Sequence, residues 1–252
     1  MQRDDKQHRS ILQKIARRAM RQRGLLPDFS PEALAELDGI QGLPAANGKV
    51  LRDLTHLLWA SIDNDDSRDL DQLTVAEVLP GDEIKILIAI ADVDSIVKKG
   101  SAIDDHARHN TTSVYTAAMI FPMLPEKLST DLTSLALKTD RLSIVIEMVI
   151  DPDGSLRDSQ IYRARVRNQA KLAYNSVAAW LEGNGAVPEA VAGVTRLDAN
   201  LRTQDRAAQR LRNLRHVHGA LSLETIKAKP IFDGDQLRNF EVEKKNLSLI
   251  HI

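Results

Sequence analysis

Hydrophobic and polar positions along the chain follow two periods, one typical of helices and one typical of strands. The apolar residues near the N-terminus recur at helical spacing: Ile11, Leu12, Ile15 and Ala19. This pattern predicts an amphipathic helix that ends at Gly24. A second helix is predicted from Ser30 to Leu37, because Ser30 suits the N-cap and Pro31 suits the first helical position.

Short apolar runs bounded by turn residues begin after this region and predict strands. The predicted strands are Leu54–Ile62, Leu73–Leu79, Glu83–Ala91, Ser143–Ile150 and Ile161–Val166, and a last hairpin turns at Asp233 and Gly234. Further helices are predicted at Ala102–His109, Tyr174–Glu182 and Leu197–His218. The strands cluster as hairpins and do not alternate with helices, so the order of elements favours an α+β fold over a parallel sheet.

Composition excludes several classes of protein. Among 252 residues, 43% are hydrophobic and 27% are charged, which is enough apolar surface to exclude a disordered chain. The longest uninterrupted apolar run, Ile86–Ala91, is far too short to span a bilayer, and no signal peptide is recognisable. The absence of cysteine excludes disulfides, zinc–thiolate sites, iron–sulfur clusters and thiol nucleophiles.

The net charge is only −1, but the charge is unevenly distributed. The first 24 residues hold two acids, Asp4 and Asp5, and eight cations: Arg3, Lys6, Arg9, Lys14, Arg17, Arg18, Arg21 and Arg23. Two interpretations stay open for this segment. It forms either the solvated face of a helix that docks on the main domain or a contact with nucleic acid or another anionic surface.

The stretch from Ser61 to Gln72 contains five aspartates within nine residues: Asp63, Asp65, Asp66, Asp69 and Asp71. Such carboxylates repel one another unless a cation or solvent screens them. A solvated acidic loop is one interpretation. A calcium loop of the EF-hand type is excluded, because Arg68 stands where such a loop needs glycine and Thr74 stands where it needs glutamate.

A magnesium site for phosphoryl chemistry is the third interpretation of this stretch. Magnesium prefers hard oxygen ligands and binds through a few carboxylates, water and substrate phosphate oxygens. Asp63, Asp69 and Asp71 would supply such ligands. The ion would then activate a water molecule and steady the leaving oxygen.

Residues 61–72 resemble the signature of the RNB catalytic domain of ribonuclease II and ribonuclease R, which are processive 3′-to-5′ exoribonucleases. That signature reads roughly T-I-D-G-x-D-x-R-D-F-D-D. Further similar blocks follow in order at 90–93 (IADV), 100–102 (GSA), 112–115 (TSVY), 122–129 (PMLPEKLS), 134–135 (SL), 140–142 (DRL) and 170–174 (AKLAY). The resemblance implies an RNB-type catalytic domain, N-terminal portion, with a mixed and mostly antiparallel sheet and flanking helices.

The resemblance also implies an activity and its residues. The expected protein is a cytoplasmic, magnesium-dependent hydrolase of the exoribonuclease II type, which releases nucleoside 5′-monophosphates from single-stranded RNA. The implied catalytic residues are Asp71, Asp69 and Asp63, and the implied magnesium ligands are the same three with Gln72. Implied RNA contacts are Tyr115, Tyr174, Arg141 and Lys171. Neither a membrane nor an obligate protein partner is implied.

Gln72 departs from the signature, which has aspartate at this position. Glutamine offers a carbonyl ligand but neither a charge nor a base, so a second metal ion or full activity is in question. An RNA-binding module without catalysis is therefore the alternative function. A calcium-stabilised structural domain with no RNA affinity is a further, non-RNA alternative.

Three segments are expected along the chain. Residues 1–50 form a basic helical segment and a linker at 42–48 (GLPAANG), and they do not resemble the cold-shock domains usual in the family. Residues 51–246 form the N-terminal part of the RNB catalytic domain. Residues 247–252 (LSLIHI) match a translated sequencing adapter and are expected to be a non-native tail, beyond which the family's domain continues.

Overall fold

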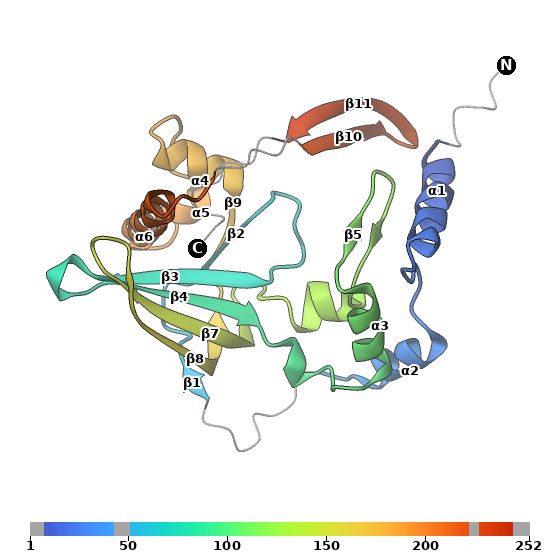
Figure 1. Ribbon diagram of the computed structural model, residues 1–252, viewed down its shortest axis with the longest axis horizontal. Helices are drawn as coiled ribbons and strands as arrows, with labels where there is room; N and C mark the ends of the chain where they lie inside the picture. The colour runs from blue at the N-terminus through green and yellow to red at the C-terminus, as the bar shows by residue number, and fades with distance from the viewer. Residues whose placement is uncertain (1–7, 43–50, 222–226, 244–252) are drawn as a thin grey trace. The chain divides into compact units, whose positions relative to one another are not determined.

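The computed structural model describes residues 8–42, 51–221 and 227–243 (Figure 1). The predicted linker from residue 43 onward, the predicted boundary at residue 50 and the predicted tail 247–252 lie outside these residues. The chain divides into two compact units. The first combines residues 1–43, 96–127 and 224–245, and the second combines residues 44–95, 128–223 and 246–252.

The second unit is built around a seven-stranded mixed sheet with the order β1-β8-β7-β4-β3-β2-β9. Its strands are β1 (Arg52–Asp53), β2 (Ala60–Asp63), β3 (Gln72–Val78), β4 (Ile84–Ala91), β7 (Asp140–Ile150), β8 (Leu156–Arg167) and β9 (Ala170–Ala173). Neighbours from β2 to β8 in the sheet pair antiparallel, whereas the short outer strands β1 and β9 pair parallel with β8 and β2. The predicted α+β class with a mixed, mostly antiparallel sheet is confirmed.

The predicted strand Leu54–Ile62 is wrong over most of its length, because only its last residues belong to β2. The segment before β2 turns through local hydrogen bonds. Asp53 Oδ1 accepts from the Thr55 amide at 3.1 Å and from the Thr55 hydroxyl at 2.7 Å, and Trp59 Nε1 donates to the Leu54 carbonyl at 2.8 Å. Such local bonds compete with a strand ladder, so the apolar run folds inward as a turn.

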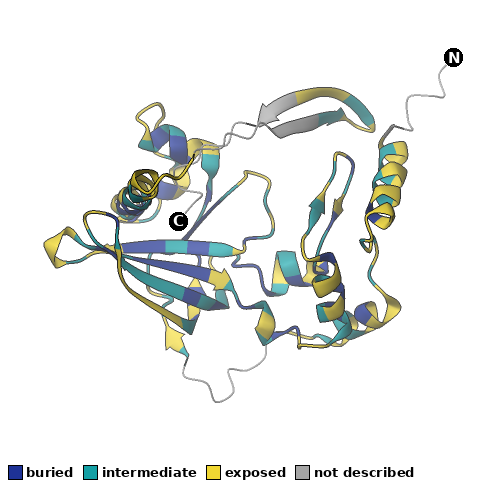
Figure 2. Ribbon diagram, viewed as in Figure 1, coloured by how far each residue is buried: buried dark blue, intermediate teal, exposed yellow. Residues whose placement is uncertain are grey.

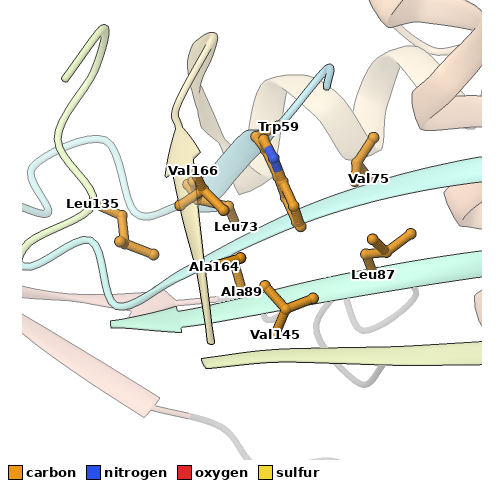
Figure 3. Close-up of a cluster of buried hydrophobic side chains, with 9 residues drawn as sticks. All are labelled: Trp59, Leu73, Val75, Leu87, Ala89, Leu135, Val145, Ala164 and Val166. Atoms are coloured by element: carbon orange, nitrogen blue, oxygen red, sulfur yellow. The ribbon is translucent and has the colours of Figure 1, made fainter. Parts of the chain in front are cut away.

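Buried side chains line one face of this sheet and form the cluster drawn in Figure 3. Its members are Trp59, Leu73, Val75, Leu87, Ala89, Leu135, Val145, Ala164 and Val166. Side chains alternate between the two faces of a strand. The even-numbered residues of β3 and β4, such as Ala76 and Ile86, therefore lie on the opposite face, where they pack against Ala207 of helix α6.

Three helices belong to the same unit: α4 (Tyr174–Leu181), α5 (Glu189–Ala192) and α6 (Leu197–Val217). Helix α6 packs against β3. Strand β2 pairs with β3 at Ala60 and Thr74, and a side chain of α6 bonds the β3 backbone two residues further on. Asn200 accepts from the Ala76 amide at 3.2 Å and donates to the Ala76 carbonyl at 2.7 Å, as a neighbouring strand would. The side chain thereby closes an edge that could otherwise pair with another chain.

The turn between β7 and β8 approaches the backbone of α6 closely. Gly154 in this turn has φ +90°, and a Cβ at this position would lie 2.4 Å from the Arg210 carbonyl oxygen. Any side chain here would clash with the helix backbone. The turn at 151–154 therefore needs its glycine for packing as well as for conformation.

Among its described residues, the first unit contains three α-helices and two small hairpins. Its elements are α1 (His8–Gln22), α2 (Pro31–Gly39), α3 (Ala102–Asn110), β5 (Val114–Tyr115), β6 (Ile120–Phe121), β10 (Lys227–Asp233) and β11 (Gln236–Glu243). Ser30 Oγ accepts from the Ala33 amide at 3.1 Å, which confirms the predicted N-cap of α2. The Asn110 side chain bonds the amide and the carbonyl of Leu26, both at 2.9 Å, and so ties α3 to the segment after α1.

Helical turns of three to six residues complete the chain: η1 (Pro80–Asp82), η2 (Val93–Ser95) and η3 (Lys127–Leu132). Buried residues concentrate in the sheet of the second unit, whereas α1 in the first unit is largely exposed (Figure 2). Within the described part of the chain, no helix combines the length and apolar character that crossing a membrane requires.

Candidate active site

The acidic stretch is the loop between β2 and β3, as the sequence predicts. Asp63 is the last residue of β2, and Asp71 immediately precedes β3. Strand β9 runs parallel to β2 and pairs Ala173 with Asp63. Tyr174, the first residue of α4, therefore follows directly beside the end of β2. The sheet thus brings an acidic loop and the start of a helix together.

Asp63 is half-buried, and its Oδ2 atom is buried without a hydrogen-bond partner. Burial raises the pKa of the Asp63 carboxyl group to about 6, and the charges of Asp71 and Asp69 add to this effect, while Lys171 opposes it. A buried oxygen without a partner is costly, because it has lost water and gained nothing in exchange. The Oδ2 atom can therefore coordinate a cation or accept a hydrogen bond.

Asp71 and Asp69 contribute further negative charge to the same place. The side chain of Asp71 is exposed, yet the surrounding protein displaces enough water to raise the pKa of its carboxyl group to about 6, with a further contribution from the charge of Asp69. Asp65 and Asp66 are exposed and fit the interpretation of a solvated loop. Asp63 does not fit it, because solvent does not reach its Oδ2 atom.

The donor set fits magnesium better than a metal that needs a complete protein cage. In the part of the chain that the structure describes, no three His, Cys, Asp or Glu side chains are gathered closely enough to hold a metal ion by themselves. Magnesium commonly takes only one or two carboxylates and keeps water and phosphate oxygens in its remaining positions. Asp63, Asp69 and Asp71 have the hard oxygens and the shared charge for such a site.

Gln72 lies on the other face of the sheet from the core cluster. It pairs with Ile90 on β4, in the same register that pairs Thr74 with Ile88. The Thr74 hydroxyl donates to Gln204 of α6 at 2.7 Å, so this face of β3 points toward the helix. Because side chains alternate along a strand, Gln72 shares the face of Thr74, and the backbone separates it from the preceding Asp71. Its role as a ligand stays a prediction.

Lys171 and Tyr174 both lie next to the acidic loop. Lys171 Nζ donates to the Ser67 carbonyl at 2.6 Å, which ties β9 to the middle of the loop. Burial raises the pKa of the Tyr174 phenol, and the negative charge of Asp63 raises it further. Tyr174 therefore stays protonated at neutral pH and can donate a hydrogen bond near the carboxylates.

Arg141 and Tyr115, the other two predicted RNA contacts, have different surroundings. The Arg141 guanidinium group donates to the carbonyls of Ser134 at 3.0 Å, Asp131 at 3.1 Å and Asp140 at 3.3 Å, and only 15% of the side chain is exposed. Tyr115 belongs to the first unit, where its side chain is 65% exposed. An RNA contact at either residue stays a prediction.

Ser134 is the functional candidate that sequence reasoning missed. Its side chain is buried, its Oγ atom accepts from the Leu70 amide at 3.1 Å, and its hydroxyl donates to the Arg68 carbonyl at 3.3 Å. Ser134 lies in one of the short blocks that resemble the exoribonuclease family. A serine in an apolar run carries no signal of its contacts, so only the fold connects it to the loop.

Other charged residues of the second unit have structural contacts. Asp92 is buried, and its carboxylate lies 2.9 Å from Arg163 Nε. On helix α6, Arg210 and Arg206 lie 2.5 Å and 3.8 Å from the Asp82 carboxylate. These two arginines therefore fit a salt-bridged surface better than a contact with RNA phosphates.

A protein family and several known proteins are similar in sequence to this chain. The RNB domain family matches residues 51–251. Ribonuclease R of Vibrio cholerae serotype O1 is 34% identical over 192 residues, which cover 76% of this chain and 23% of that protein. Exoribonuclease 2 of Escherichia coli O157:H7 is 33% identical over 185 residues, which cover 72% of this chain and 28% of that protein.

The fold is also similar to that of a solved structure, Mycoplasma genitalium RNase R in complex with ribose methylated single-stranded RNA. The TM-score is 0.81 at 24% identity, over 92% of this chain and 36% of that chain. The chain spans about a quarter of the length of the curated relatives it matches, 23% and 28% for the two named above. The match over residues 51–251 shows that the chain belongs to the RNB domain family.

Proposed function

We propose that this chain carries the metal site of a magnesium-dependent exoribonuclease, which removes nucleoside 5′-monophosphates from the 3′ end of single-stranded RNA. The relatives named Ribonuclease R and Exoribonuclease 2 support this reaction class, and the similar Mycoplasma genitalium structure holds single-stranded RNA. The observation that carries the proposal is the buried, unpartnered Oδ2 atom of Asp63, which lies at the end of β2, where a loop with four other aspartates begins.

Asp63, Asp69 and Asp71 would hold the magnesium ion. When bound, the ion would lower the pKa of a water molecule and stabilise the leaving oxygen of the phosphodiester. With a pKa of about 6, the carboxyl groups of Asp63 and Asp71 are mainly ionised at neutral pH and available as ligands. Tyr174 keeps its proton and can donate to a phosphate oxygen or stack on a base.

The test uses the 252-residue chain, a 5′-labelled single-stranded oligoribonucleotide and a magnesium titration. We expect a ladder that shortens from the 3′ end and mononucleotides that appear only with magnesium. Asp71→Asn should abolish the products and leave RNA binding intact. Binding to the oligonucleotide with no magnesium-dependent product, at any magnesium concentration, would contradict the proposal.

The alternative is an RNA-binding module without catalysis. It is favoured by Gln72, which replaces the fourth aspartate of the family signature and shares the α6-facing side of β3 with Thr74. The same experiment separates the two functions, because a binding module would hold the labelled RNA and release no nucleotide.

A further inference from the structure

The backbone of the acidic loop is held from outside by residues that lie far away in the sequence. Lys171 holds the Ser67 carbonyl at 2.6 Å, and the Ala91 amide donates to the Asp71 carbonyl at 3.0 Å. Between these two anchors, the part of the loop around Asp69 is held by one short segment, Ser134 and Leu135. This segment makes three hydrogen bonds to the loop.

These three bonds enclose Asp69 on both sides. Before Asp69, the Arg68 carbonyl accepts from the Ser134 hydroxyl at 3.3 Å. After Asp69, the Leu70 amide donates to Ser134 Oγ at 3.1 Å, and the Leu70 carbonyl accepts from the Leu135 amide at 2.8 Å. A single hydroxyl group thus bonds the peptide groups on either side of the aspartate. Ser134 and Leu70 are 1% and 4% exposed, so water has little access to the bond between these two residues.

Arg141 fixes the segment that carries Ser134. Its Nε atom donates to the Ser134 carbonyl at 3.0 Å, and its Nη2 atom donates to the Asp131 carbonyl at 3.1 Å. One guanidinium group therefore holds two points of the chain before β7. A lysine at this position has one donor group on a flexible stem and cannot hold both points with the same geometry.

We propose that Ser134 is a positioning residue for the metal site, which fixes Asp69 relative to Asp63 and Asp71, and that Arg141 acts through Ser134. Asp63, Asp69 and Asp71 lie within nine positions of one another, and their like charges repel unless a cation or solvent screens them. Without external bonds, the repulsion would spread the loop and move Asp69 away. This inference rests on the proposed magnesium site and adds the residues that hold its ligands in place.

The experiment compares Ser134→Ala with a matched control, Ser143→Ala. Ser143 is also a buried serine of the second unit, and its hydroxyl donates to the Ala164 carbonyl at 3.2 Å on β8. Both variants lose one buried hydroxyl group, so both should melt at a lower temperature than the wild type without metal. The magnesium concentration that produces half of the thermal stabilisation is then measured for each protein.

We expect Ser134→Ala to need about tenfold more magnesium, in the range of losses seen when residues that support metal ligands are removed. Ser143→Ala should need as much magnesium as the wild type. Arg141→Lys provides a second variant in case Ser134→Ala does not fold, and it should shift the magnesium midpoint in the same direction by a smaller factor.

The outcomes distinguish the proposed metal site from the positioning role of Ser134. A wild-type chain that is not stabilised by magnesium would overturn the proposed metal site and this inference with it. If the wild type responds and neither Ser134→Ala nor Arg141→Lys shifts the midpoint, only the positioning role is overturned. An equal shift in Ser143→Ala would also overturn it, because the effect would then follow general destabilisation.

Discussion

The acidic loop of the second unit and the basic helix α1 of the first unit are both strongly charged, but their charges differ in burial and in interactions. In the loop, Asp63 has lost part of its water, and its charge interacts with those of Asp69 and Asp71. In α1, Lys14 and Arg18 are exposed, and neither has an ion-pair partner among the residues that the structure describes. One region concentrates charge at a point, and the other spreads it over a surface.

This difference indicates two kinds of ligand. Partly buried carboxylates at a fixed place suit a small divalent cation, because such a cation replaces the lost solvation and removes the repulsion. Exposed cations on long side chains suit a flexible polyanion, whose phosphates bind by releasing counterions. We therefore expect the loop to decide catalysis and α1 to contribute only affinity for RNA.

The largest effect is expected from Asp71→Asn. The substitution keeps the shape of the side chain and removes one ligand charge, and metal-assisted catalysis supplies several kcal/mol through such charges. Cleavage of a labelled oligoribonucleotide should fall by about a hundredfold or more, since each 1.4 kcal/mol corresponds to tenfold in rate. Binding of the same RNA, measured by fluorescence anisotropy, should change little. Cleavage within tenfold of the wild type would remove Asp71 from the catalytic residues.

The second effect concerns the stability of the metal-free chain as a function of pH. The folded state raises the pKa of Asp63 from 3.8 to about 6, so the folded chain prefers the protonated carboxyl group. This contribution to stability is complete below pH 3.8 and is lost as the pH rises through about 6. Without metal, the contribution of Asp63 should therefore lower the melting temperature as the pH rises from 3.8 to about 6.

Asp63→Asn should remove most of this pH-dependent decrease. It should raise the metal-free melting temperature at pH 7 by about 2–4 °C, the shift expected for roughly 1 kcal/mol in a chain of this size. Magnesium should stabilise the wild type at pH 7 but not the variant. The measurement is thermal melting from pH 4 to pH 8 with and without magnesium. An identical pH profile in both proteins would show that Asp63 is solvated like an ordinary surface carboxylate.

The sequence predicted the place of the acidic loop because its position depends on a local pattern, an apolar strand followed by aspartates. It also predicted the N-cap at Ser30, which depends on a single residue. It could not predict the contact between Ser134 and Leu70, because 64 positions separate these residues and only the folded sheet brings them together. For the same reason, the unpartnered oxygen of Asp63 was visible only in the structure.

The strand predicted at Leu54–Ile62 shows the opposite case, in which a local pattern misled. An uninterrupted apolar run is compatible with a buried strand or with a buried turn, and periodicity does not separate the two. The deciding contacts are the bonds of Asp53 to Thr55 and of Trp59 to the Leu54 carbonyl. These bonds involve polar atoms of the segment, and the pattern of apolar positions contains no information about them.

A smaller effect is expected from removing charge on α1. The triple variant of Lys14, Arg18 and Arg21 to Gln should weaken binding of single-stranded RNA by up to about tenfold at low salt. It should also lower the slope of log affinity against log salt by about 0.7 for each lost phosphate contact. The rate of cleavage at saturating RNA should stay unchanged, since these residues lie outside the acidic loop.

The control for α1 removes the same number of cations where each one has an acidic partner: Arg108 with Asp105, Arg157 with Glu83 and Arg238 with Asp233. The net charge then changes equally in both triple variants. A loss of RNA affinity in the control as large as that in the α1 variant would show that overall charge governs binding. The helix would then be the solvated face that the sequence also allowed.

The smallest effect is expected from Gln72→Asp, which restores the fourth aspartate of the family signature. If Gln72 faced the metal, the new carboxylate would tighten magnesium binding and increase the repulsion in the metal-free loop. The register of β3 places Gln72 opposite Ile90 and on the side that faces α6, away from Asp71. We therefore expect the magnesium midpoint to change by less than about twofold, because a charge at the rim of the site interacts weakly through water. The same magnesium-dependent melting experiment measures this change, with Gln72→Asn as the neutral control. A midpoint that falls by tenfold in the aspartate variant alone would show that residue 72 reaches the metal and that the strand begins only after it.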